Sequence, residues 1–269
     1  MVERMALHKI ARNSVSDAVY EQLSREILEG RIQPGDNLPA ERALCDVLGV
    51  NRGAIREALK RLGQAGLVEI RHGGGSTVLD FRSSAGTALL SGLLLKSDGS
   101  VDYEVGRSVM EMRAALGPDV ARLCALRRSE ELIERLQNRV DTMERDAGDV
   151  QALQHHDIEF WQLLIEGAQN IAYRLAYNSL RATYEHLREL LARTLTEEVS
   201  DLSGHRELLD AIRDGDGDRA ETSARRLLSS GTEAVLALIQ WLEMLPSPEP
   251  SAPPHRSALA DQKPEKNDL

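Results

Sequence analysis

Residues 37–78 decide the fold of the first part of the chain; they read NLPAERALCDVLGVNRGAIREALKRLGQAGLVEIRHGGGSTV. Two short helices are predicted, over residues 40–48 and 52–64, because a glycine follows each apolar-periodic segment. Asn51 can cap the second helix with its side-chain oxygen. The intervening turn at Gly49 is short enough to make the pair a helix-turn-helix.

The flanking residues extend this pattern on both sides. Upstream, residues 16–29 carry apolar side chains at helical spacing and predict a further helix. Downstream, LVEI (67–70) and TVLDF (77–81) predict two strands, and the glycine-rich RHGGGST between them predicts a hairpin turn. The order helix, helix, turn, helix, hairpin is that of a winged helix-turn-helix.

The remainder of the chain shows helical patterns without strand signals, so the fold class is mainly α. We predict an N-terminal winged helix-turn-helix domain over 1–80 and an all-α bundle of six to seven helices over 81–245. Residues 246–269 hold six of the nine prolines, and their composition predicts a disordered tail. The predicted helices of the bundle are 86–95, 103–125, 130–145, 150–166, 171–194, 199–213 and 218–244.

Charge and composition narrow the class of protein. The net charge is −10, but residues 1–80 carry 11 basic and 11 acidic side chains, so DNA binding would depend on a few placed arginines. Cys45 and Cys124 have no metal-type spacing and are expected to be buried apolar groups. Neither a signal peptide nor a membrane-spanning segment is recognisable, so we expect a cytoplasmic protein with no membrane partner.

The helix over 52–64 is the candidate recognition helix, because the second helix of a helix-turn-helix enters the major groove with its N-terminal residues. Arg52 and Arg56 lie four residues apart on one face and can pair with guanine. Small residues beside them would let the backbone approach the duplex. The alternative is that these arginines form only a solvated helix face. From this pattern the DNA-binding candidates are Asn51, Arg52, Gly53, Ala54 and Arg56.

Residues 15–78 closely resemble the DNA-binding domain of the GntR family of bacterial regulators. The run PGxxLPAER followed by LGVxRxxxREALxRLxxxGLV carries the resemblance. It implies that Arg42 reaches DNA from the helix before the turn, together with Arg52 and Arg56. It also implies that His72 and Gly73, at the tip of the wing, enter the minor groove.

The helical remainder resembles the C-terminal domain of the FadR subfamily, also called FCD. Members of that subfamily often bind a divalent metal through one Asp and three His. Here DIEFW supplies Asp157 but places Trp161 at a histidine position, GHREL supplies His205, and ARRLL places Leu227 at the last position. Trp and Leu cannot coordinate a metal, so we predict that this site is lost and that no metal or other cofactor is bound.

Aromatic residues gather in one part of this domain. Five of the nine lie between Phe160 and Tyr184, and Tyr173, Tyr177 and Tyr184 share one side of a helix. A stripe of this kind is commonly part of a core. Because a buried Tyr still needs a partner for its hydroxyl, several of them in a chain so poor in aromatics also suggest a lined cavity.

The segment GAQNIAYRLAYNSLRATYEHL also resembles fatty-acid regulators of the FadR type, which lack the metal and bind long-chain acyl-CoA. In this resemblance Arg113 occupies the position of an anion-binding arginine. A small carboxylate, or an effector of another kind, remains an open alternative, since the fold does not determine the ligand. The candidate effector-binding residues are Arg113, Asp157, Trp161, Tyr173, Tyr177, Tyr184 and His205.

These patterns predict a homodimer that binds double-stranded operator DNA and responds to a small molecule. The junction at residues 80–95 would couple the two domains. An architectural DNA-binding protein without an effector is one rival interpretation. An enzyme is the other, but the sequence offers neither a phosphate loop nor a complete ligand set, and we expect no catalytic residues.

Overall fold

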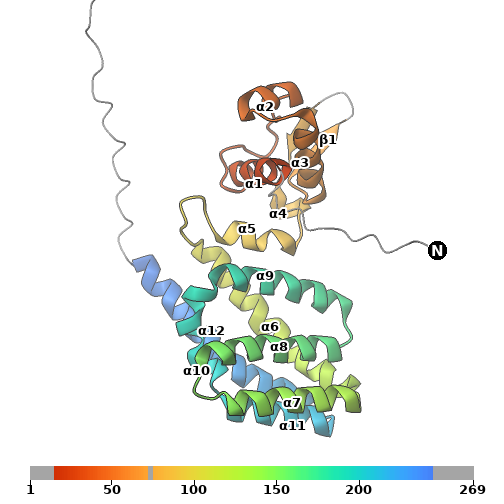
Figure 1. Ribbon diagram of the computed structural model, residues 1–269, viewed down its shortest axis with the longest axis vertical. Coiled ribbons are helices and arrows are strands. Elements are labelled where there is room, and N and C mark those ends of the chain that lie inside the picture. The colour runs from red at the N-terminus through yellow and green to blue at the C-terminus, as the bar shows by residue number, and fades with distance from the viewer. Residues whose placement is uncertain (1–14, 72–74, 245–269) are drawn as a thin grey trace, which may run out of the picture.

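The computed structural model describes residues 15–71 and 75–244. The described chain forms a small α/β unit followed by a larger helical domain, with the short helix α5 between them (Figure 1). The predicted disordered tail over 246–269 lies outside the described residues, as do His72 and Gly73 at the wing tip.

The small unit has the elements of a winged helix-turn-helix. Its helices are α1 (Val15–Leu28), α2 (Glu41–Leu48) and α3 (Arg52–Gln64), followed by the antiparallel strands β1 (Val68–Arg71) and β2 (Gly75–Val78). The predicted helices agree with these bounds to within one residue. Side chains from all three helices and from both strands form one apolar core, which includes Leu23, Leu44, Ile55, Leu62, Val68 and Val78.

The turn of the helix-turn-helix forms for local reasons. Gly49 ends α2 with φ of 66°, a left-handed conformation that glycine adopts without strain. Asn51 then caps α3, because its Oδ1 accepts a hydrogen bond from the backbone N–H of Ala54 at 2.9 Å. The capping role predicted for Asn51 is confirmed.

The second strand is shorter than predicted, and the last residues of TVLDF belong to the junction instead. β2 ends at Val78, and Asp80 caps the short helix α4 (Phe81–Ser84) by accepting a hydrogen bond from the N–H of Arg82. The predicted helix over 86–95 is divided into a 3-10 turn, η1 (Thr87–Leu89), and α5 (Leu90–Leu94). The side-chain cap at Asp80 therefore starts a helix where the last residues of the strand were predicted.

Seven helices make up the larger domain. Helices α6 and α12 pack against each other along most of their lengths, and α7, α8, α9 and α11 surround them (Figure 1). The predicted segments fall on these helices, and the stretch expected as one helix over 199–213 is divided by Ser200 and Asp201. The bounds are α6 (Tyr103–Arg127), α7 (Glu130–Arg145), α8 (Val150–Gly167), α9 (Ile171–Thr194), α10 (Thr196–Val199), α11 (Leu202–Asp214) and α12 (Gly217–Met244).

The core of this domain lies at the end where α7 and α11 pack against α6, α8 and α12. Gly167 permits close packing there, since an added Cβ would lie 2.5 Å from the Sγ of Cys124. Cys124 is fully buried, and burial raises the pKa of its thiol to about 12, so it behaves as the expected apolar group. Nothing in the described ranges is a helix long and apolar enough to cross a membrane.

Candidate effector cavity and DNA-binding surface

The N-terminal turn of α3 presents an exposed surface. Arg52, Gly53 and Arg56 are exposed, whereas the side chain of Ala54 is only 9% exposed and faces the interior. Ala54 thus packs toward the core of the winged unit, and its place among the DNA-binding residues stays a prediction that rests on the close approach of the backbone. At Gly53 an added Cβ would lie 3.1 Å from Oδ1 of Asn51, so a larger residue would crowd the cap.

The arginines near this surface differ in how they are held. Arg42 is exposed on α2, and Arg56 forms an exposed ion pair with Glu41 at 2.9 Å. By contrast, Arg61 pairs with Asp17 and lies 4.3 Å from the ring centroid of Tyr20, so it fastens α3 to α1. Arg42, Arg52 and Arg56 thus remain the candidates for DNA contact, while His72 and Gly73 lie outside the described residues.

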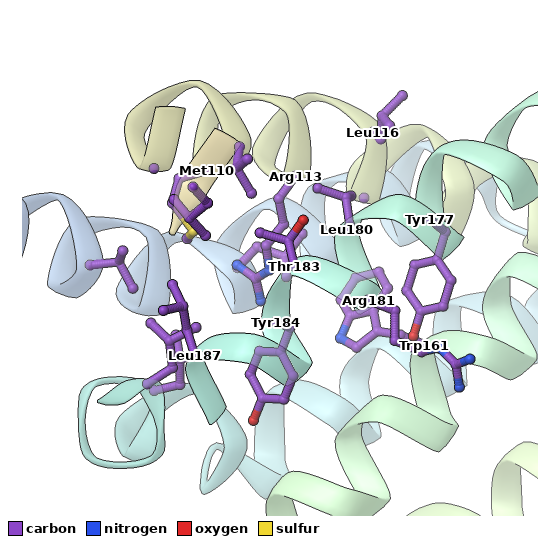
Figure 2. A pocket seen from close by; sticks show the side chains of 18 of the residues that line it. Met110, Arg113, Leu116, Trp161, Tyr177, Leu180, Arg181, Thr183, Tyr184 and Leu187 are labelled. Carbon is purple, nitrogen blue, oxygen red and sulfur yellow. The ribbon is translucent and has the colours of Figure 1, made fainter. Parts of the chain in front are cut away.

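A cavity of about 170 Å³ lies in the other domain, near the small unit (Figure 2). Its walls come from α6, α8, α9 and α12, with Leu94 of α5 closing one end. Most of the side chains that line it are apolar, among them Met110, Leu180, Leu187, Leu228 and Ile239. Its few polar groups gather where α6, α8 and α9 meet.

The three predicted tyrosines all line this cavity, but their hydroxyl groups are held differently. Tyr173 donates a hydrogen bond to Oδ2 of Asp119 at 2.8 Å, and Tyr177 donates one to the carbonyl of Ile158 at 3.2 Å. Figure 2 shows Tyr177 and Tyr184, which lie about two turns apart on α9. Burial raises the pKa of Tyr177 and Tyr184, so both remain neutral near pH 7.

Asp157 and His205 meet at one side of the cavity. Asp157 lines the cavity, whereas His205 is fully buried behind it, with Nε2 at 3.0 Å from Oδ1 of Asp157 and Nδ1 at 2.8 Å from the carbonyl of Asp201. Burial lowers the pKa of His205, but the hydrogen bond and charge of Asp157 outweigh it, and the net pKa lies above its usual value.

This arrangement does not fit the metal site that the subfamily implies. Both His205 nitrogens are already hydrogen-bonded, and the side chains of Trp161 and Leu227, nearly buried, offer no donor for a cation. Within residues 15–71 and 75–244, no three His, Cys, Asp or Glu side chains are grouped as metal ligands would be.

Arg113 lines the cavity and forms an ion pair with Glu198, whose side chain is 1% exposed. Oε2 of Glu198 has no hydrogen-bond partner among the described residues, and an added Cβ at Gly231 would collide with it. Burial raises the pKa of Glu198 to about 7, although Arg113 acts in the opposite direction. Because Arg113 is paired with Glu198, its positive charge is only partly available to an anionic ligand in the cavity.

Six of the seven predicted effector residues therefore lie at one cavity, and the seventh, His205, supports Asp157. Sequence reasoning missed Glu198. It lies in the acidic run TEEVSD, which in the sequence has the composition of an exposed segment. Sequence reasoning also missed Thr183, which is 2% exposed and whose hydroxyl donates to the carbonyl of Ser179. Thr183 lies well to one side of the tyrosine face of α9, so the helical spacing gave no signal for it.

Two family profiles match the chain. Residues 15–78 match the bacterial regulatory proteins of the gntR family, and residues 108–230 match the FCD domain. The first match covers the winged helix-turn-helix, and the second covers most of the helical domain that contains the cavity.

Relatives with known names agree with both matches. The chain is 41% identical to the HTH-type transcriptional regulator Mce2R of Mycobacterium tuberculosis over 87% of this chain and 97% of that protein. It is 30% identical to the fatty acid metabolism regulator protein of Edwardsiella ictaluri over 65% of this chain and 71% of that protein. The solved structure of Lar from Listeria monocytogenes has the same fold, with a TM-score of 0.54 at 19% identity, over 85% of this chain and all of Lar.

The likeness to Mce2R covers 87% of the chain and so extends through both domains, and Mce2R is named as an HTH-type transcriptional regulator. The chain therefore belongs to the GntR family of bacterial regulatory proteins, as a DNA-binding transcriptional regulator with an FCD-type C-terminal domain.

Proposed function

We propose that the protein is a homodimeric regulator whose affinity for its operator is controlled by an effector that has a long apolar chain and an anionic group. Long-chain acyl-CoA is the candidate class. The observation that carries this proposal is the cavity itself, which is apolar along most of its length and has Arg113 on one wall.

The replacement of metal ligands supports an apolar effector. Trp161 lines the cavity together with Val120 and Ile165, and Leu227 packs in the same apolar core. A hydrocarbon chain would be stabilised there by roughly 0.8 kcal/mol for each methylene group that it buries. A small carboxylate, the alternative, could use Arg113 but would leave the apolar walls unfilled.

A relative gives independent support for this class. The Edwardsiella ictaluri protein, to which the chain is similar over 65% of its length, is called a fatty acid metabolism regulator. That name describes the relative, and its extension to this chain is part of the proposal.

The junction offers a route from the cavity to the DNA-binding unit. Leu89 and Leu93 pack into the core of the winged unit, whereas Leu94, the next residue, lines the cavity. In addition, the hydroxyl groups of Thr87 and Ser179 lie 3.1 Å apart and join the junction to α9. An effector that moves α9 or Leu94 would therefore displace α5 and change the spacing of the two recognition helices in a dimer.

Operator affinity with and without effector tests the proposal. An operator selected from random-sequence DNA with the full chain would be labelled and followed by fluorescence anisotropy. We expect palmitoyl-CoA to release the operator and acetyl-CoA, which has the same head but almost no chain, to leave it bound. Equal effects of both compounds, or no effect of either, would contradict an apolar effector.

A further inference from the structure

A second, polar groove adjoins the apolar cavity. It has a volume of about 660 Å³, within the range of about 300–1,000 Å³ typical of small-molecule sites, and it lies between α7, α8 and α9. Tyr177 and Arg181 line both the groove and the cavity, so the two spaces meet at these residues. Figure 2 shows the two side chains next to each other at the edge of the cavity.

Ion pairs between α7 and α8 form one wall of the groove. Arg135 makes two hydrogen bonds to the carboxylate of Glu166, at 2.6 and 2.9 Å. Arg139 pairs with Glu159 at 2.7 Å, and its Nε is buried without a hydrogen-bond partner among the described residues. In each pair the glutamate neutralises the arginine, and the two ion pairs hold this wall in place.

The opposite wall comes from α9 and carries unmatched positive charge. Arg174 and Arg181 are seven residues apart, with Tyr177 between them, and so lie on one face of the helix. In the described part of the chain neither guanidinium group forms a hydrogen bond or an ion pair, although the charge of Arg174 helps to lower the pKa of Glu166 across the groove. The groove therefore contains four arginines against two glutamates, an excess of two positive charges beside an apolar cavity.

We propose that this groove binds the phosphate groups of the effector, so that the full ligand is a phosphorylated head group joined to an apolar chain. Guanidinium groups bind phosphate through paired hydrogen bonds, and two unpaired ones on a single helix face suit a diphosphate. The chain would enter the cavity past Tyr177, while the phosphates stay between Arg174 and Arg181. This inference rests on the proposed function and adds a binding site that free fatty acids would not use.

Calorimetry with matched ligands tests the groove. The wild type is expected to bind palmitoyl-CoA at least tenfold more tightly than palmitate, which has the same chain without phosphates. In the double variant Arg174→Gln with Arg181→Gln, palmitoyl-CoA should lose this advantage. The single variant Arg174→Gln, whose residue lines the groove and not the cavity, should weaken the binding of palmitoyl-CoA and leave the affinity for palmitate within twofold. Arg188→Gln is the control, because Arg188 lies on α9 outside the groove and pairs with Glu185 at its surface.

Two results would overturn the proposal: equal affinity of the wild type for both ligands, or undiminished binding of palmitoyl-CoA by the double variant. Lysophosphatidate, which has a chain and a phosphate but no nucleotide, shows whether the head group belongs to a lipid or to a coenzyme. If neither palmitate nor palmitoyl-CoA binds, the proposed function fails. Coenzyme A alone then tests the groove: binding that the double variant loses supports it, and no binding overturns it.

Discussion

Nε2 of His205 lies 3.0 Å from Oδ1 of Asp157, so the two residues that remain from the metal-binding set of the subfamily bond to each other. The contact holds Asp157 at the wall of the cavity and satisfies a histidine that is fully buried. It gives the residual pair a structural role in a site whose other two positions are apolar.

The first prediction concerns metal binding. Because Trp161 and Leu227 cannot coordinate a cation, Zn²⁺ or Ni²⁺ should not raise the melting temperature of the wild type, and a chelator should not lower it. The variant Trp161→His with Leu227→His completes one carboxylate and three imidazoles, and it should gain stability on adding Zn²⁺. A melting temperature of the wild type that rises with metal would contradict the loss of the site.

The second prediction concerns the pH dependence of stability. The pKa of Glu198 is raised from 4.5 to about 7, so between these values the folded protein holds a proton that the unfolded chain has released. Stability therefore falls as pH rises through this range, by about 3 kcal/mol at most. His205, whose pKa is also raised, acts in the same direction above its usual value of 6.5.

Urea unfolding at pH 5 and pH 8 measures this effect. In Glu198→Gln the loss of stability between the two pH values should shrink, because the glutamine does not titrate and can still accept a hydrogen bond from Arg113. Glu197→Gln, an exposed neighbour on α10, is the control and should behave as the wild type. The same pH dependence in all three proteins would show that Glu198 titrates normally.

The third prediction concerns DNA recognition. Arg52 is exposed in the first turn of α3 and is expected to read a base edge, so Arg52→Ala should weaken operator binding by roughly 10- to 100-fold with little effect on random DNA. Lys60, further along α3, should contact phosphate, and Lys60→Ala should mainly reduce the salt dependence of binding. Anisotropy over a range of salt concentrations separates the two, and equal losses on both DNAs for Arg52→Ala would contradict base reading.

The fourth prediction concerns the connection between the domains. Glu29, at the end of α1, accepts hydrogen bonds from the N–H and the hydroxyl of Ser97, at 2.7 and 2.8 Å, in the loop before α6. Glu29→Ala should leave effector affinity unchanged but weaken the release of operator by effector. Glu26→Ala removes only an exposed pair with Arg31 and serves as the control. Normal release from the Glu29 variant would exclude this contact from the coupling.

Sequence patterns predicted the helices well because their signals are local. Asn51 caps α3 and Gly49 ends α2 through contacts within a few residues, and α3 and α9 have the bounds that periodicity predicts. The hairpin was less well predicted: the segment predicted as its second strand, 77–81, includes Asp80, which caps α4 instead, and β2 is Gly75–Val78.

The cavity could be predicted only in part. The three tyrosines belong to one helix, α9, and their spacing reveals a common face. Glu198, by contrast, contacts Arg113, which is 85 residues away in the sequence, and no local pattern marks such a contact. Burial of Ala54 likewise depends on how α3 packs against the rest of the winged unit. The polar groove depends on how α7, α8 and α9 pack together, which periodicity does not specify.

The most direct test of the central claim uses Trp161, which lines the cavity, as a probe for the effector. The chain has two tryptophans, and Trp241 is 58% exposed on α12, so Trp241→Phe leaves Trp161 as the sole emitter. A long acyl-CoA with a bromine on its chain should quench this emission saturably, over the same concentrations that release the operator. Release of the operator with unchanged Trp161 emission would place the effector elsewhere and contradict the claim.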